Sequence, residues 1–250
     1  FGDTETSEGW AECSRAALAG GTTTIVDFAI PRPGEDPIEA FRHRLADAAE
    51  HCVSDYSLHG CYTERHLDAI DRIDELIGLG TRTIKVYTTY KDKLMASDAT
   101  IERVMSALRQ ADGMIHVHAE DDDFVTGRLE ELKSRGPVPF DRITEVRPVE
   151  AENIATRRII DLALKVGTAC YFVHQASPEA IESVRDARGS GGRFYSEVCP
   201  HYLVLDDSQY AHGHGCRFTC CPPLRPAEVR DELMRQVLDG RVDVIASDHC

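Results

Sequence analysis

The feature that most constrains the fold is a regular alternation of strand-like and helix-like segments along nearly all 250 residues. The strand-like runs are rich in β-branched and aromatic residues, whereas the helix-like runs repeat apolar residues every three or four positions. Alternation of this kind predicts a parallel sheet whose strands are joined by helical crossovers. The predicted strands are 22–28, 55–61, 81–91, 113–120, 169–174, 193–198 and 242–248.

Residues that favour helix starts precede several of the helix-like runs. Ser7 can cap a first helix, Pro37 opens a second, Ser97 or Asp98 caps a later one, and Ser177 with the following proline begins another. Apolar residues at helical spacing also predict one continuous helix over about 64–79.

Seven such strands, with one more ahead of the first predicted helix, would close an eight-stranded (β/α)8 barrel of the TIM type. A doubly wound open sheet is the alternative. The chain begins at Phe1 without an initiator methionine and ends at Cys250, directly after a strand-like run. We therefore interpret residues 1–250 as a single barrel domain that is truncated at both ends. No glycine-rich phosphate-binding motif follows a strand, so no nucleotide site is predicted.

Composition narrows the classes of function. The chain carries 43 acidic and 28 basic residues, a formal charge of −15, with no basic stripe. This argues against nucleic acid or an anionic membrane as a partner, and no apolar run is long enough to span a bilayer. Nine scattered cysteines favour reduced thiols in a cytoplasmic enzyme. Cys216, Cys220 and Cys221 lack paired C-x-x-C spacing, so we interpret them as structural.

Lys85 lies in the middle of the third predicted strand. Side chains alternate along a strand, so Ile84 and Val86 share one face while Thr83, Lys85 and Tyr87 share the other. A buried ammonium is costly unless it is paired, deprotonated or chemically modified. The alternative is an edge strand that leaves the lysine in solvent.

Residues with metal-ligand chemistry stand at the ends of three other strands. His118 ends one, His174 another and Asp248 the last. Each has a plain explanation by itself, such as a hydrogen-bonded surface histidine or a helix cap. Together with Lys85 they predict a metal site, because the carboxyl ends of barrel strands carry the active site in this fold.

The residues around these positions resemble the dihydropyrimidinase and hydantoinase family of cyclic amidohydrolases. The resemblance covers T-I-K-V-Y-T-T-Y-K (83–91), H-V-H-A-E-D (116–121), F-V-H-Q-A-S (172–177) and A-S-D-H-C (246–250). It extends to G-G-T-T-T-I-V-D-F (20–28), R-P-V-E-A-E (147–152), E-V-C-P-H-Y-L (197–203) and C-C-P-P-L-R (220–225).

The resemblance implies a centre of two divalent metal ions, usually Zn²⁺, that hydrolyses the cyclic amide of a small-molecule substrate. Lys85 would be carboxylated to N6-carboxylysine and bridge the ions, His118 and His174 would bind one ion, and Asp248 would bind the other and act as general base. Tyr90 would donate a hydrogen bond to the oxyanion, and its alternative role is ordinary packing. A homotetramer is also implied by the resemblance.

The family's first strand carries an H-x-H pair that binds the ion beside Asp248. Phe1 follows the expected place of that pair, and the family's terminal β-sandwich segments are expected outside residues 1–250. We therefore expect this chain alone to lack hydrolase activity. Cys221 stands where the family commonly has a serine that contacts substrate through its backbone, and Gln175-Ala176 replace Val-Ser after His174.

Two further histidine patterns need separate interpretation. His116 is interpreted as a core residue and not as a ligand. His212 and His214 lie in a glycine-rich stretch and are expected to be exposed. Allantoinase, dihydroorotase and a metal-free oligomeric scaffold homologue are the alternative functions.

Overall fold

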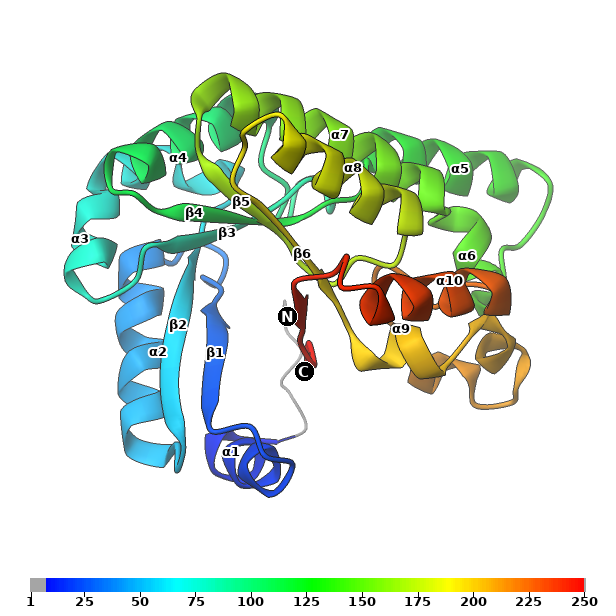
Figure 1. Ribbon diagram of the computed structural model, residues 1–250, viewed down its shortest axis with the longest axis horizontal. Helices are drawn as coiled ribbons and strands as arrows, with labels where there is room; N and C mark the ends of the chain where they lie inside the picture. The colour runs from blue at the N-terminus through cyan, green and yellow to red at the C-terminus, as the bar shows by residue number, and fades with distance from the viewer. Residues whose placement is uncertain (1–7, 250) are drawn as a thin grey trace.

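The computed structural model describes residues 8–249 and shows a parallel sheet curled like part of a barrel, with helices on its outer side (Figure 1). The strands lie side by side in chain order and each pair is parallel. They are β1 (Thr24–Ala29), β2 (Asp55–Cys61), β3 (Thr83–Tyr87), β4 (Met114–His118), β5 (Ala169–Phe172), β6 (Phe194–Val198) and β7 (Val244–Ile245). A doubly wound sheet reverses its strand order at a switch point, so the barrel-type prediction is confirmed.

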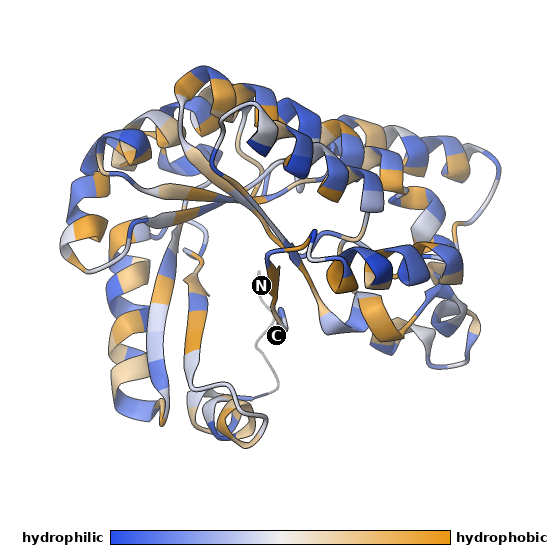
Figure 2. Cartoon of the chain, in the orientation of Figure 1, coloured by the Kyte–Doolittle hydropathy of each residue, from blue (hydrophilic) through white to orange (hydrophobic). Residues whose placement is uncertain are grey.

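The strands are connected by α-helices and short 3₁₀ helices. These are α1 (Trp10–Ala19), α2 (Pro37–His51), η1 (Glu64–Arg72), α3 (Ile73–Gly78), α4 (Asp98–Gln110), α5 (Asp122–Ser134), η2 (Phe140–Arg142), α6 (Ile143–Val146), α7 (Val149–Val166), α8 (Pro178–Gly189), α9 (Pro200–Val204), η3 (Asp207–Ala211), η4 (Gly215–Phe218) and α10 (Ala227–Leu238). Hydrophobic and hydrophilic residues alternate around the long helices (Figure 2), as expected for helices with one face on a sheet.

The core lies mainly between the sheet and these helices. Ile84 of β3 and Ile115 of β4 are fully buried there, against Ile101 of α4 and Ile159 of α7. Burial of side chains of this size stabilises the fold by about 1.5–3 kcal/mol each. The helix covering therefore holds the central strands, and with them the inward-facing side chains, in fixed positions.

Three predicted helix starts are confirmed. Asp36 caps α2, whose first residue is Pro37, and its carboxylate accepts from two backbone N–H groups of the first turn. Ser97 caps α4 and Ser177 caps α8 through their hydroxyls. The predicted cap at Ser7 lies outside the described residues, and α1 begins at Trp10.

Two predicted elements differ from the structure. The helix expected over 64–79 is divided into η1 and α3 at Arg72, whose backbone leaves the helical region (φ −106°, ψ 15°). Near the start of η1, His66 also leaves this region and forms a capping box with Thr63. The strand expected over 242–248 is reduced to β7, which pairs with β6 and with no second strand among residues 8–249. The sequence analysis also missed α9, η3 and η4, whose short lengths leave no periodic signal.

Gly113, just ahead of β4, provides a test of packing at the amino ends of the central strands. A Cβ there would lie 2.6 Å from the Arg82 carbonyl oxygen and 2.8 Å from a methyl group of Leu108. We expect Gly113→Ala to lower the free energy of unfolding by about 1–3 kcal/mol, because the backbone must shift. Urea denaturation measures this, with Gly78→Ala as control since that position is open. Equal losses in the two variants would contradict the prediction.

Candidate active site at the carboxyl ends of the strands

Lys85 points into the interior from a central strand. β3 pairs with β2 on one side and β4 on the other, and Lys85 is only 3% exposed, so the edge-strand alternative is wrong. Its ammonium lies 4.9 Å from the ring centre of Phe28 and 5.0 Å from that of Tyr87. Within residues 8–249 this ammonium forms no hydrogen bond or salt bridge. Lys85 is thus a buried amine without a direct anionic partner.

Burial also changes the acidity of this amine. It lowers the pKa of Lys85 to about 8, and the negative charges of Asp248 and Glu197 oppose that shift. A substantial fraction of the amine is therefore neutral near pH 8, and a neutral amine is the nucleophilic form.

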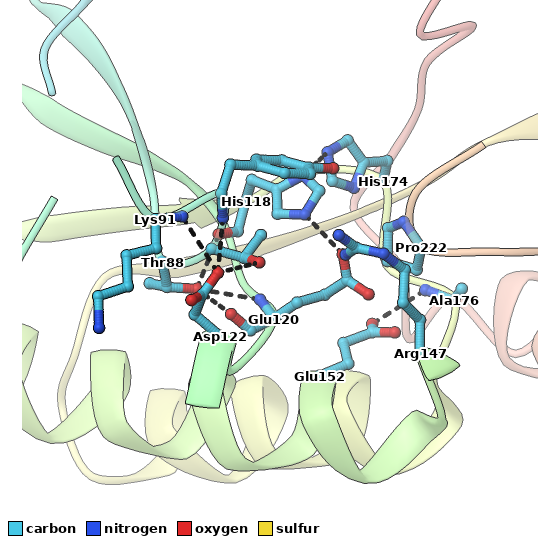
Figure 3. Close-up of polar contacts among 12 residues, drawn as sticks. Thr88, Lys91, His118, Glu120, Asp122, Arg147, Glu152, His174, Ala176 and Pro222 are labelled. Carbon is cyan, nitrogen blue, oxygen red and sulfur yellow. Dashed lines mark hydrogen bonds and ion pairs between the residues drawn. The ribbon is translucent and has the colours of Figure 1, made fainter. Parts of the chain in front are cut away.

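His118 and His174 face each other beside this lysine. His118 ends β4, and His174 follows β5 by two residues with a positive φ of 40°. The Nδ1 of His118 lies 3.0 Å from the Nε2 of His174, and both rings are buried (Figure 3). Burial lowers the pKa of both imidazoles, so both are neutral and can act as ligands.

A carboxylate fixes the tautomer of His118. Burial alone would raise the pKa of Glu120, but the hydrogen bond to His118 and the charge of Arg147 hold it below its usual value. The ionised Glu120 can only accept, so the Nε2 of His118, 2.8 Å away, donates to it. The Nδ1 of His118 therefore presents a lone pair toward His174.

Tyr90 lies over this pair on the segment after β3. Its φ is 69°, and its backbone N–H donates to Asp122 at 2.8 Å. Its ring centre is 5.3 Å from that of His118 and 5.0 Å from the guanidinium carbon of Arg147. Burial raises the pKa of the Tyr90 phenol, as does its hydrogen bond with the Cys221 thiol, so the phenol is protonated and can donate.

Asp248 occupies a different environment. It follows β7 by three residues, has a φ of 48° and is exposed. Its negative charge nevertheless raises the pKa of Lys85 and of Cys199. It therefore lies within electrostatic range of the buried lysine, although the predicted strand does not extend to it.

Of the remaining histidine candidates, two lie at the surface, and His116 lies on β4 opposite Lys85 of β3. His116 is buried, with its ring stacked 4.5 Å from that of Tyr171. His212 and His214 are exposed, as expected. Among residues 8–249 the only group of three His, Cys, Asp or Glu side chains with ligand spacing lies at the surface, and such groups are common without an ion; it comprises Glu8, Cys13 and His249.

The sequence analysis assigned no role to the residues that orient this site. Glu120 accepts from His118, and Asp122 accepts from the backbone of Tyr90. Glu197 accepts from the backbone N–H of His174 at 2.8 Å. Glu120 and Glu197 stand within the motifs that carry the family resemblance. Glu120 also follows the strand-end His118 by two residues, and this proximity was the available signal.

This curled parallel sheet, with polar residues gathered at the strand ends, has the architecture of a (β/α) barrel, and comparison with known proteins identifies the family. Residues 3–187 match the amidohydrolase family, and the chain belongs to it.

Known proteins are similar to this chain over its whole length. The D-hydantoinase of Streptomyces coelicolor is 32% identical over 252 residues, and the alignment covers 100% of this chain and 54% of that protein. The D-hydantoinase of Geobacillus stearothermophilus is 32% identical over 256 residues, with the same shares covered. The crystal structure of the dihydropyrimidinase of Brevibacillus agri matches with a TM-score of 0.94 at 30% identity, covering 100% of this chain and 55% of that one.

This chain spans about half the length of the curated relatives it matches. Among the described residues no helix combines the length and apolar character needed to cross a bilayer.

Proposed function

We propose that the protein containing this chain hydrolyses the cyclic amide bond of a hydantoin or dihydropyrimidine. The observation that carries the proposal is the buried amine of Lys85, which has no hydrogen-bond or salt-bridge partner among residues 8–249, beside the facing nitrogens of His118 and His174. The similarity to D-hydantoinases and a dihydropyrimidinase supports this choice of substrate class.

The residues present fit a metal centre. His118 offers a lone pair on Nδ1, which faces the Nε2 of His174 at 3.0 Å, and the Nδ1 of buried His174 has no hydrogen-bond partner among residues 8–249. Neutral imidazoles with carboxylate-type oxygens suit Zn²⁺. His118 and His174 would hold one ion, Asp248 the other, and Lys85 both.

Lys85 can bridge two cations only after modification. The neutral amine would attack carbon dioxide, forming a nitrogen–carbon bond and releasing a proton, to give N6-carboxylysine. This replaces an unpaired buried cation by an anionic oxygen ligand. The lowered pKa of Lys85 supports this step, because it increases the fraction of neutral amine.

The chain's own residues would divide the remaining work. Two close divalent ions, when bound, lower the pKa of water and polarise the substrate carbonyl. Asp248 would accept the proton of the attacking water and return it to the leaving amide nitrogen. Tyr90 would donate its phenolic proton in a hydrogen bond to the oxyanion of the tetrahedral intermediate. The backbone at Cys221 would contact substrate.

Turnover by the full-length protein tests the proposal. We expect zinc-loaded protein to open the rings of hydantoin or dihydrouracil much faster than those of allantoin or dihydroorotate. Preference for allantoin or dihydroorotate would support those alternative activities, and absence of turnover together with absence of bound metal would support the scaffold alternative. A homotetramer in the cytoplasm is proposed with the enzyme, and light scattering of the full-length protein tests the tetramer.

A further inference from the structure

Glu120 lies at the centre of a buried polar contact that the proposed chemistry does not use. It is 0% exposed, and one carboxylate oxygen, Oε2, accepts from both His118 at 2.8 Å and Arg147 at 2.5 Å. Figure 3 shows Glu120 between these two side chains. The other oxygen, Oε1, has no partner among the described residues. Burying a carboxylate carries a large desolvation cost, and the contacts with His118 and Arg147 offset part of this cost.

Arg147 also contacts Tyr90, the candidate oxyanion donor. Its guanidinium lies over the ring of Tyr90, with the carbon 5.0 Å from the ring centre, and its side chain is only 13% exposed. Its backbone carbonyl accepts from Arg225 at 2.6 Å, which fixes the segment between α6 and α7. One planar cation thus contacts both Glu120 and Tyr90.

The backbone of Glu120 is tied to the end of β3. Its N–H donates to the Thr88 hydroxyl at 3.0 Å, and this hydroxyl lies 2.8 Å from the Glu120 carbonyl oxygen. Thr88 comes three residues after Lys85 and two before Tyr90. The carboxylate therefore sits on backbone whose place is set by the Lys85 strand.

We propose that Glu120 and Arg147 form a brace that positions His118 and Tyr90 relative to each other. They are positioning residues, since they act through these two side chains. The inference rests on the proposed function, but its main readout is metal binding, which needs no turnover. Glu120 would hold the His118 ring with Nδ1 toward the metal, and Arg147 would hold the Tyr90 ring above it.

The first test concerns the action of Glu120 on His118. It measures the Zn²⁺ affinity of the full-length protein by competition with a chromophoric chelator. We expect Glu120→Gln to weaken binding roughly 10- to 100-fold, as loss of a carboxylate behind a metal-binding histidine commonly does. The matched control is Glu145→Gln. Glu145 also pairs with an arginine, Arg142, at 2.6 Å, but their side chains are 45% and 34% exposed, and we expect no measurable change. Zn²⁺ affinity equal to wild type in folded Glu120→Gln overturns the brace.

Steady-state kinetics of Arg147→Lys tests the action of Arg147 on Tyr90. This variant also decides whether the brace exists if Glu120→Gln does not fold. Lysine keeps a charge for Glu120 but has no planar group to stack on Tyr90. We expect bound zinc to be retained, kcat to fall roughly 3- to 10-fold and KM to change little. Arg142→Lys is the control. Unchanged kcat in Arg147→Lys contradicts the brace. Wild-type protein that binds zinc without opening cyclic amides would instead refute the proposed function, and the Glu120 affinity measurement would still decide the brace.

Discussion

Replacing Lys85 by alanine is expected to remove bound metal and nearly all activity from the full-length protein. The Lys85 side chain is buried on a central strand, and its amine has no hydrogen-bonding partner among the described residues. No neighbouring group could therefore take over its proposed bridging role. Loss of the proposed anionic bridge would leave the two proposed cations close together without the charge that holds them. We expect kcat/KM to fall by roughly 10³-fold or more, about 4 kcal/mol of transition-state stabilisation.

Lys85→Arg separates the chemistry of the amine from its charge. A guanidinium cannot be carboxylated and stays cationic, so this variant should lose metal as completely as the alanine variant. Lys133→Ala is the control, because Lys133 is an exposed lysine on α5. Elemental analysis gives the metal content of each purified protein. Two ions per chain retained in either Lys85 variant would refute the bridging role.

The inward position of Lys85 was predictable because it follows from local rules. Side chains alternate along a strand, and a strand flanked on both sides in a curled parallel sheet has one face toward the interior. The convergence of His118 and His174 follows similarly, since carboxyl ends of parallel strands meet at one end of the barrel. Motif spacing thus placed three residues whose backbone belongs to, or directly follows, regular strands.

Residues positioned by irregular segments could not be placed in this way. Arg147 reaches Glu120 across 27 positions because the segment between α6 and α7 folds back over the strand ends, and no periodic pattern encodes that return. His66 interrupts the first turn of η1, and its side chain accepts from the backbone N–H of Thr63, a local interaction that apolar spacing does not reveal. Asp248 is exposed because β7 is short and paired on one side among the described residues.

Tyr90→Phe is the second large expected effect, because it removes one hydroxyl and leaves the ring in place. The unusual backbone at Tyr90 is held by Asp122, which also accepts from the Thr89 hydroxyl at 2.9 Å. The ring itself packs against His118 and Arg147. These contacts do not use the hydroxyl, and its hydrogen bond with the Cys221 thiol is the interaction that the variant removes. We expect the variant to fold and keep its metal.

The cost should therefore appear in catalysis alone. A donor to the oxyanion acts mainly in the transition state, so we expect kcat to fall roughly 10²- to 10³-fold, about 2.7–4 kcal/mol, with KM nearly unchanged. Tyr195→Phe is the matched control, since Tyr195 is 39% exposed on β6. Metal content measured beside kcat and KM distinguishes a lost hydrogen bond from a lost ion. A Tyr90→Phe protein with wild-type kcat would show that Tyr90 only packs over the site, and the oxyanion donor would then have to be another group.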